Sequence, residues 1–134
     1  MKKEKIKKTD KEWQSTLTPE QYAICREKGT ETPFQNRYCD EKKPGIYQCV
    51  CCGNDLFRSD EKFDSGTGWP SFWVPIQKDS VCTKKDQNLS GVRQEVLCQV
   101  CDAHLGHVFE DGPPPTNLRY CINSVSLKLK KNKS

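Results

Sequence analysis

The stretch Gly-Ile-Tyr-Gln-Cys-Val-Cys-Cys-Gly, residues 45–53, joins a short β-type run to a cysteine pair, Cys49 and Cys52, in C-x-x-C spacing. A second pair with the same spacing, Cys98 and Cys101, follows later in the chain. A tight turn at each pair directs two thiolates at one ion, and two such turns complete a tetrahedron. We therefore expect the four cysteines to hold one Zn²⁺ per chain and to pin distant parts of a sheet together.

Two other interpretations of these cysteines remain open: a C-x-x-C redox pair, and thiols that are only buried. Cys51 could in principle replace Cys49 or Cys52, although the spacing favours Cys49 with Cys52. Four thiolates leave no open coordination position on a zinc ion. A zinc held here is therefore expected to be structural, and catalysis has to come from other residues.

A short helix is predicted over residues 17–29, LTPEQYAICREKG. Thr18 suits the N-cap position, and Gln21 completes a capping box with it. Pro19 is favoured at the first helical position, and Gly29 is expected to stop the helix. One short N-terminal helix is thus expected to precede the body of the domain.

Short β-type runs alternate with turn residues from about residue 45 onward. The predicted runs are residues 45–50, 71–76, 91–98, 107–109 and a last stretch beginning at Arg119. The chain has 134 residues, of which only 34% are apolar. One modest antiparallel β core is therefore expected, with cysteine chemistry as an additional source of stability.

The last predicted strand can be analysed by parity, because alternate residues of a strand face opposite sides. If no bulge intervenes, one side holds Arg119, Cys121, Asn123, Val125, Leu127 and Leu129, and the other holds Ser124, Ser126, Lys128 and Lys130. A guanidinium next to Cys121 would favour its thiolate, and Asn123 offers an amide donor for a substrate oxygen. Taken alone, each of the other cysteines outside the C-x-x-C pairs is better interpreted as a small buried hydrophobe.

Two histidines, His104 and His107, follow the second cysteine pair directly. They would face opposite sides of a regular strand, but Gly106 permits a bulge or turn that brings them to one site. An acid partner for a nucleophilic cysteine is the expected use. Trp69, fixed in a turn between Gly68 and Pro70, is the aromatic residue of this part of the chain least suited to a strand interior.

Positive charge is concentrated at the ends of the chain, with six lysines in residues 1–11 and four in residues 128–133. We interpret the ends as solvated tails. A nucleic-acid-binding arm is the alternative, but no arginine–aromatic interleaving supports it. No apolar run qualifies as a signal peptide or a membrane span, so we expect a cytoplasmic protein that binds neither membrane nor nucleic acid and keeps its thiols reduced.

Five stretches in series resemble the methionine sulfoxide reductase B family, which reduces the R epimer of methionine sulfoxide. They are GTETPF (29–34), GIYQCVCCG (45–53), KFDSGTGWPSF (62–72), DAHLGHVF (102–109) and RYCINS (119–124). The resemblance implies a mainly β fold of two antiparallel sheets closed by a four-cysteine zinc site, behind a short helix. It covers about residues 13–130 and implies one zinc-containing reductase domain there, with basic tails at 1–12 and 131–134.

Carried over by position, the resemblance implies that Cys121 is the nucleophile and that Trp69 binds the substrate methyl group. The family's other site residues fall on His104, His107, Asn123, Arg119 and Asp111, with His107 as the acid and Asp111 as the anchor of Arg119. The Cys121 thiolate then attacks the sulfoxide sulfur, His107 protonates the oxygen and Asn123 holds it. Methionine leaves, and thioredoxin or another thiol reduces the Cys121 sulfenic acid, which repairs oxidised methionine in proteins.

Thr67 departs from the family pattern, because many relatives carry a recycling cysteine at this position. Threonine cannot resolve a sulfenic acid. Recycling is therefore expected to pass directly to an external reductant or through one of the remaining cysteines, Cys25, Cys39, Cys51 or Cys82. A non-catalytic zinc-stabilised β module with an aromatic binding pocket is the alternative to an enzyme, and it would have no use for Cys121 beside His107 and Asn123.

Overall fold

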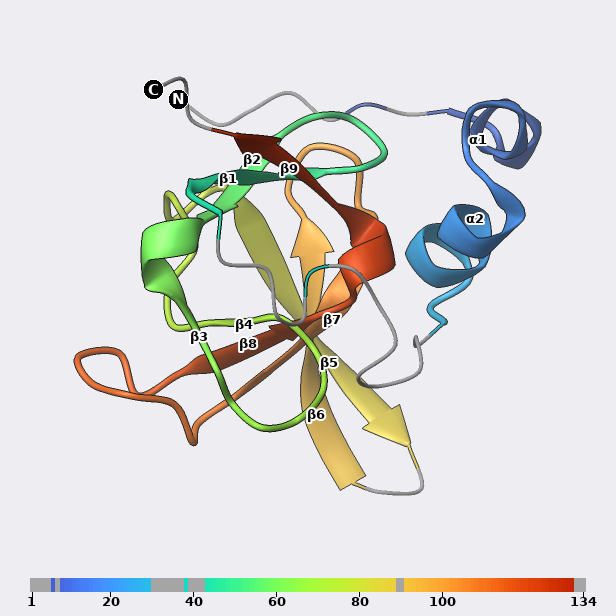
Figure 1. Ribbon diagram of the computed structural model, residues 1–134. Coiled ribbons are helices and arrows are strands. Elements are labelled where there is room, and N and C mark those ends of the chain that lie inside the picture. The colour runs from blue at the N-terminus through green and yellow to red at the C-terminus, as the bar shows by residue number, and fades with distance from the viewer. Residues whose placement is uncertain (1–5, 7, 30–37, 39–42, 89–90, 132–134) are drawn as a thin grey trace.

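The computed structural model describes residue 6 and residues 8–29, 38, 43–88 and 91–131. In this part of the chain two antiparallel sheets form the body, and two short helices lie at one side of it (Figure 1). No helix among the described residues has the length and apolar character needed to cross a membrane. The mainly β fold with two antiparallel sheets is confirmed.

The predicted helix is α2 (Pro19–Arg26). Its capping box is formed as expected: the Gln21 backbone N–H donates to the Thr18 hydroxyl at 3.1 Å, and the Thr18 backbone N–H donates to the Gln21 side chain at 2.9 Å. The helix ends before Gly29, whose N–H donates to the carbonyl oxygen of Ala23 at 3.0 Å. A side chain at Gly29 would crowd that carbonyl, so the glycine permits this close return of the backbone.

A second helix, α1 (Asp10–Thr16), was not predicted. It has its own capping box, in which Thr9 and Glu12 exchange hydrogen bonds. Trp13 is its buried residue, and the Arg26 guanidinium lies 4.5 Å from the Trp13 ring centroid. The beginning of α1 falls within residues 1–12, so part of the expected basic tail is helical.

The larger sheet has six strands in the order β3-β4-β8-β7-β6-β5. Their bounds are β3 (Lys62–Phe63), β4 (Ser71–Phe72), β5 (Val81–Asn88), β6 (Gly91–Cys98), β7 (His104–Phe109) and β8 (Arg119–Ile122). The register places Ser71 opposite Cys121, and Cys121 opposite His107. Strands β4, β7 and β8 therefore bring three separate parts of the chain to one place.

The smaller sheet has three strands in the order β2-β1-β9. They are β1 (Gly45–Cys49), β2 (Asp55–Arg58) and β9 (Leu127–Lys131), and two one-turn helices, η1 (Ser59–Glu61) and η2 (Ser124–Ser126), complete the described elements. Cys49 ends β1 in the smaller sheet, whereas Cys98 ends β6 in the larger one. A metal shared by these residues would link the two sheets.

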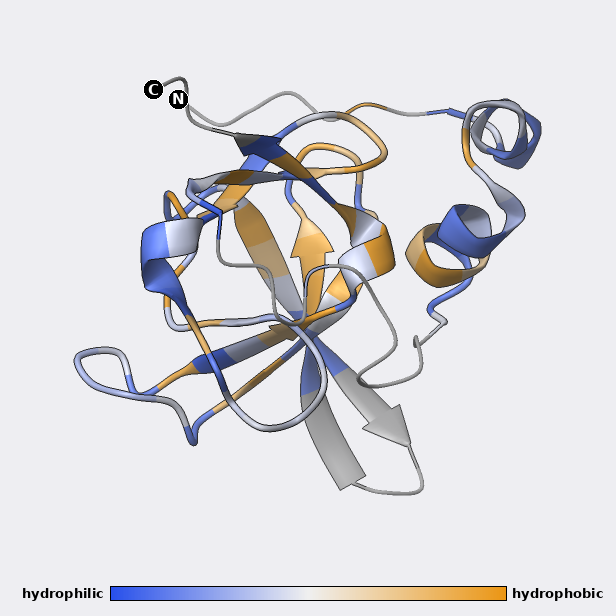
Figure 2. Cartoon of the chain, in the orientation of Figure 1, coloured by the Kyte–Doolittle hydropathy of each residue, from blue (hydrophilic) through white to orange (hydrophobic). Residues whose placement is uncertain are grey.

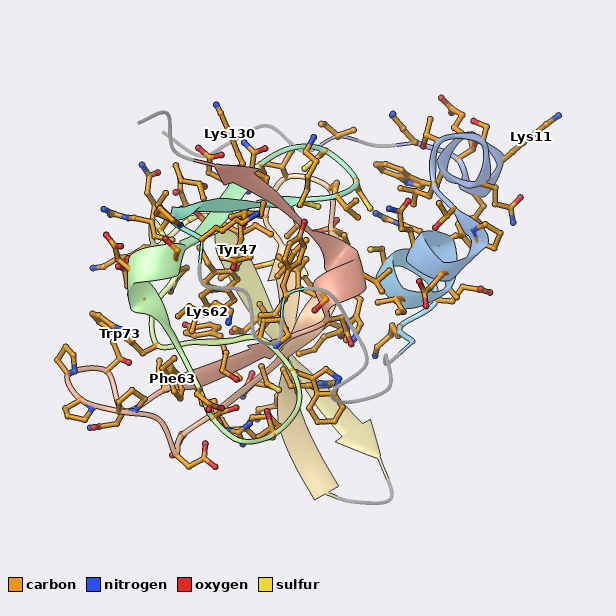
Figure 3. All side chains as sticks on the ribbon, in the orientation of Figure 1. Lys11, Tyr47, Lys62, Phe63, Trp73 and Lys130 are labelled. Atoms are coloured by element: carbon orange, nitrogen blue, oxygen red, sulfur yellow. The ribbon has the colours of Figure 1, made fainter. Side chains whose placement is uncertain are left out.

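Aromatic side chains fill the space between the sheets. Phe57 of β2 stacks on Phe72 of β4 with ring centroids 4.4 Å apart, and Tyr47 meets Phe72 edge to face at 5.2 Å. Apolar residues gather on the central strands and the inner side of α2 (Figure 2). Tyr47 points into this core, while Lys11 and Lys130 point away from the body (Figure 3). Burial of these rings supplies the main favourable term in folding.

The prediction of one continuous last strand is wrong. The chain turns through η2 between β8 and β9, and the two strands belong to different sheets. Ser124 and Ser126, assigned to the polar face by parity, are buried, and Ser126 donates to the carbonyl oxygen of His104 at 3.1 Å. Parity counting fails because the one-turn helix breaks the two-residue period.

Several predictions lie outside the described residues. They are most of the stretch 29–34, the alternative recycling residue Cys39, and the end of the C-terminal tail at 132–134.

Candidate active site and metal centre

The four cysteines of the two C-x-x-C pairs lie together, with all four sulfur atoms within 4.8 Å of one another. Cys49 Sγ is 3.6 Å from Cys101 Sγ, and Cys52 Sγ is 3.6 Å from Cys98 Sγ. Thiolates bound tetrahedrally to zinc at about 2.3 Å would be about 3.8 Å apart. The sulfur spacing therefore fits a tetrahedral thiolate-bound metal ion.

Both cysteine pairs are built on the same kind of turn. The N–H of Gly53 donates to the Cys49 carbonyl oxygen at 2.8 Å, and the N–H of Asp102 donates to the Cys98 carbonyl oxygen at 2.9 Å. Gly53 and Asp102, which directly follow each pair, have positive φ angles of 81° and 59°. Glycine and aspartate tolerate this left-handed conformation, so the local sequence at both turns suits the geometry.

Ionisation of the four thiols also requires a cation at the centre of the cluster. The contact between Cys49 and Cys101 lowers the pKa of the Cys101 thiol and raises that of Cys49. Together the four sulfurs can be fully ionised only around a positive ion. Asn54 adds an amide donor 3.7 Å from Cys98 Sγ, an outer contact of the kind that orients metal ligands. Cys51 is not a member of the four-sulfur group, which agrees with the spacing argument.

A separate pocket of about 240 Å³ opens on the larger sheet. Its lining residues come from the loop before β4, from β7, and from β8 and the residue after it: Thr67, Trp69, Gly106, His107, Phe109, Arg119, Cys121 and Asn123. Most of the predicted site residues therefore meet in one cavity. His104 and Asp111 do not line it.

Cys121 lies at the centre of this pocket, half-buried on β8. Its strand neighbours Tyr120 and Ile122 are buried on the opposite side of β8. Cys121 therefore faces the pocket and not the apolar core, which corrects the parity prediction of an apolar face continuing to Leu129. This orientation leaves the sulfur accessible to a substrate.

A bulge in β7 brings the two histidines near each other. Val96 pairs with Gly106 and Leu97 with His104, so Leu105 is an extra residue in β7. The His104 and His107 rings are 5.5 Å apart, edge to face. A side chain at Gly106 would collide with the carbonyl oxygen of Cys121, so glycine is required where β7 approaches β8.

His107 is the histidine that reaches the pocket, directly opposite Cys121 in the β7–β8 register. Side chains directly opposite in an antiparallel pair have Cβ atoms about 5 Å apart. His104 instead is 2% exposed, and burial lowers its pKa, against the opposing effect of a hydrogen bond with Glu95. The position of His107 suits proton transfer to a substrate beside Cys121. His104 is held by Glu95 next to the His107 ring and suits a positioning role.

Glu95, the hydrogen-bond partner of His104, is a residue that the sequence analysis missed. The residue is 2% exposed, and its carboxylate accepts a hydrogen bond from His104 Nδ1 at 2.7 Å and lies 3.3 Å from the ammonium of Lys28. It projects from β6 in a β-type run with no motif around it. Only the expectation that a buried acid needs a partner could have drawn attention to it, and burial was unknown from sequence.

Arg119 is held at the pocket wall on two sides. Its guanidinium makes a bidentate pair with Asp111, with distances of 2.8 and 3.1 Å, and lies 4.4 Å from the Phe109 ring centroid. The hydrogen bond with Asp111 raises the pKa of Arg119, and a weaker contribution comes from Cys121. A fixed cation beside Cys121 favours the thiolate form of that residue.

Asn123 and Trp69 occupy the remaining pocket walls. Asn123 is buried, and both its backbone N–H and its side-chain amide donate to the carbonyl oxygen of Leu105, at 2.8 and 3.1 Å. These bonds fix the orientation of the amide beside the pocket. Trp69 is half-buried in the turn before β4, as its flanking residues suggested.

The other described cysteines lie elsewhere. Cys25 is buried and within hydrogen-bonding distance of Ser126, at 3.5 Å, and of Cys51, which in turn contacts Cys101 of the metal cluster. Cys82 lines a different cavity, with Val81 and Tyr120. Of the described cysteines, only Cys121 lines the pocket.

Comparisons with known proteins agree with this geometry. A family model described as SelR domain matches residues 17–131. Curated proteins named peptide methionine sulfoxide reductase MsrB are 56% identical in Hahella chejuensis, covering 94% of this chain and 91% of that protein, and 57% identical in Herminiimonas arsenicoxydans, covering 94% and 92%. The crystal structure of the Mis18 'Yippee-like' domain is similar with a TM-score of 0.55 and 18% identity, covering 69% of this chain and 100% of that one, which speaks for the fold alone.

Proposed function

The chain belongs to the SelR-domain family, and we infer from this membership that it is a peptide-methionine (R)-S-oxide reductase. The observation that carries the inference is the 56% identity over 94% of the chain to a curated peptide methionine sulfoxide reductase. The pocket supports it chemically, because it pairs a half-buried thiol with an imidazole across two hydrogen-bonded strands. A non-catalytic binding module would have no need of that pairing.

We propose that Cys121 is the nucleophile. Its thiolate attacks the sulfoxide sulfur, the substrate oxygen is transferred to the cysteine sulfur, and the products are methionine and a Cys121 sulfenic acid. His107 supplies a proton to the oxygen as negative charge develops there. The location of His107 directly opposite Cys121 supports this role.

The remaining pocket residues are proposed to bind and orient the substrate. The Trp69 ring offers an apolar surface for the substrate methyl group, and the Asn123 amide, held by the Leu105 carbonyl oxygen, is suited to the sulfoxide oxygen. Arg119, anchored by Asp111, stabilises the Cys121 thiolate before attack. We propose oxidised methionine in proteins and peptides as the substrate, because the pocket is open to solvent on a sheet face.

Recycling of the sulfenic acid is proposed to depend on an external thiol. None of the other described cysteines lines the pocket, and Cys25 and Cys51 are engaged beside the metal cluster. A thiol of thioredoxin or a small molecule would condense with the sulfenic acid, release water and form a mixed disulfide, which a second thiol then reduces. Such chemistry requires a reducing compartment, and we propose a cytoplasmic location on that ground.

We propose Zn²⁺ as the metal of the four-cysteine cluster. Four thiolates in tetrahedral spacing are the donor set that zinc prefers in structural sites. The cluster would hold the ends of β1 and β6 together and would stabilise one reductase domain at about residues 13–130. A site closed by four protein ligands takes no part in the reaction.

The function is tested by intact mass spectrometry after one exposure of the reduced protein to R-methionine sulfoxide without reductant. Wild type is expected to release methionine and to gain one oxygen, located on Cys121 by peptide mapping. Cys121→Ser should release none and retain its metal and fold, while the matched control Cys82→Ser should behave as wild type. Activity retained by Cys121→Ser would refute the nucleophile, and an unchanged wild-type mass with no methionine released would favour a binding module.

A further inference from the structure

Three hydroxyl groups form a continuous chain that ends at Cys121. Thr67 Oγ1 is 3.8 Å from Cys121 Sγ and 2.7 Å from Ser65 Oγ. Ser65 Oγ is in turn 2.7 Å from Ser71 Oγ, and the Ser71 hydroxyl donates to the carbonyl oxygen of Trp69 at 3.2 Å. Thr67 thus contacts the reacting sulfur, and two serines connect it to the backbone.

The direction of every bond in this chain follows from counting hydrogens. A carbonyl oxygen can only accept, so the single hydroxyl hydrogen of Ser71 is used at Trp69. Ser65 must then donate to Ser71, and Thr67 must donate to Ser65. The remaining link, between Thr67 and Cys121, is satisfied only when the thiol S–H donates to Thr67. All four links are complete in this arrangement, and it belongs to the neutral thiol.

Ionisation of Cys121 reverses the requirement, because a thiolate can only accept. Thr67 can then donate to the sulfur, Ser65 to Thr67, and Ser71 to Ser65. The cost is the bond to the Trp69 carbonyl oxygen, which at 3.2 Å is longer than the serine–serine bond at 2.7 Å. The reversal only rotates hydroxyl hydrogens; the thiol proton itself passes to water at the half-buried sulfur. A bond to a charged acceptor is stronger than the neutral bond given up.

The protein holds this chain in place from several directions. Ser71 is fully buried and lies opposite Cys121 in the β4–β8 register. Ile122, which follows Cys121, donates its N–H to the carbonyl oxygen of Pro70, which precedes Ser71, at 3.0 Å. Thr67 itself is flanked by Gly66 and Gly68, both with positive φ angles, of 74° and 91°. The turn geometry thereby directs a short side chain at the sulfur of β8.

We propose that Thr67 is a further catalytic residue, whose hydroxyl stabilises the Cys121 thiolate through a hydroxyl chain of reversible polarity. Ser65 and Ser71 are positioning residues that let the threonine hydroxyl turn toward the sulfur. The proposal rests on the proposed nucleophilic role of Cys121. The proposal gives a function to Thr67, which stands where many relatives have a cysteine. In this chain, the residue at position 67 helps to form the Cys121 thiolate.

The test compares Thr67→Val, which keeps the shape of the side chain without its hydroxyl, with Thr67→Ser, which keeps the hydroxyl. Thr83→Val, on the exposed part of β5, is the matched control. Alkylation of Cys121 by iodoacetamide is followed by peptide mass spectrometry across a pH series, on the metal-loaded protein and without substrate. Circular dichroism and metal content establish that each variant is folded.

Thr67→Val is expected to alkylate Cys121 about tenfold more slowly at neutral pH, with the whole pH profile displaced upward, because one charge-assisted hydrogen bond to the thiolate is lost. Thr67→Ser and Thr83→Val should follow wild type, and Ser65→Ala should lie between the two groups. An unchanged pH profile in folded Thr67→Val would overturn the proposal. So would equal slowing in Thr67→Val and Thr67→Ser, since packing and not the hydroxyl would then matter.

This readout separates the two levels of the argument. If wild type reduces methionine sulfoxide through Cys121 but Thr67→Val alkylates normally, the threonine role fails and the reductase function stands. If Cys121→Ser remains an active reductase, the proposed nucleophile fails whatever the alkylation profile of Thr67→Val.

Discussion

Removal of the Glu95 carboxylate should destabilise the protein by an amount that depends on what replaces it. Glu95→Ala leaves the buried His104 N–H without its acceptor, now 2.7 Å away, and removes the partner of Lys28. A buried hydrogen bond to a charged group contributes about 1.5–3 kcal/mol, and the half-exposed Lys28 pair adds little. We expect a loss of about 3 kcal/mol for Glu95→Ala and about 1 kcal/mol for Glu95→Gln, which keeps an acceptor oxygen.

The pH dependence has a defined sign. Burial is the main cause that lowers the pKa of His104, and Glu95 opposes it. A histidine held neutral in the fold stabilises the protein fully above its unfolded pKa of about 6.5, and this stability is lost as pH falls through the lower folded pKa. In Glu95→Gln the opposing anion is gone, so the folded pKa of His104 falls further. The loss of stability on acidification should therefore be larger and extend to lower pH.

Urea unfolding of the metal-loaded protein, followed by tryptophan fluorescence at several pH values, measures both effects. Glu110→Ala is the matched control, because Glu110 is an exposed acid that directly follows β7, the strand that carries His104. Glu95→Ala within about 0.5 kcal/mol of this control at neutral pH would refute the reasoning, since surface substitutions usually fall in that range. An acid sensitivity unchanged in Glu95→Gln would show that Glu95 does not set the titration of His104.

Three further predictions follow from the metal centre, the β7–β8 contact and the pocket. Cys49→Ser and Cys98→Ser should each lose the bound metal and the folded state, because the ligands join the two sheets. Elemental analysis measures the metal and circular dichroism measures the fold, and a folded, metal-free variant would contradict the prediction. Gly106→Ala should lower the free energy of unfolding by about 1–3 kcal/mol and reduce reductase activity, because its Cβ would collide with the Cys121 carbonyl oxygen, and wild-type values for both would count against the close contact. In Thr67→Cys, the sulfenic acid of Cys121 should be replaced by a disulfide between positions 67 and 121, because position 67 contacts the Cys121 sulfur. Intact mass should then show the loss of two hydrogens in place of the gain of one oxygen. If only the oxygen adduct is found, the turn cannot close to the roughly 2.05 Å of a disulfide bond.

The features that the sequence determined by itself are those set by residues close together in the chain. The capping box of Thr18 and Gln21 was predictable because its bonds span three residues. The turns at Cys49 and Cys98 were predictable for the same reason, since C-x-x-C spacing needs only one tight turn. A bulge near Gly106 was also anticipated from glycine alone, and the structure places the extra residue at Leu105. The resemblance to a known family then connected these separate segments.

The tertiary structure decided how the segments meet. Cys121 faces the pocket because its neighbours Tyr120 and Ile122 are buried on the other side of β8. The alternation could not be counted from the last strand of the sequence, because η2 separates β8 from β9. Glu95 joins His104 only because β6 pairs with β7 and buries the carboxylate. Thr67 reaches the Cys121 sulfur because β4 pairs with β8, and this pairing places Ser71 opposite Cys121, about fifty residues apart in sequence. Such contacts depend on which strands pair and in which register, and that choice is made by burial over the whole core, not by any local pattern.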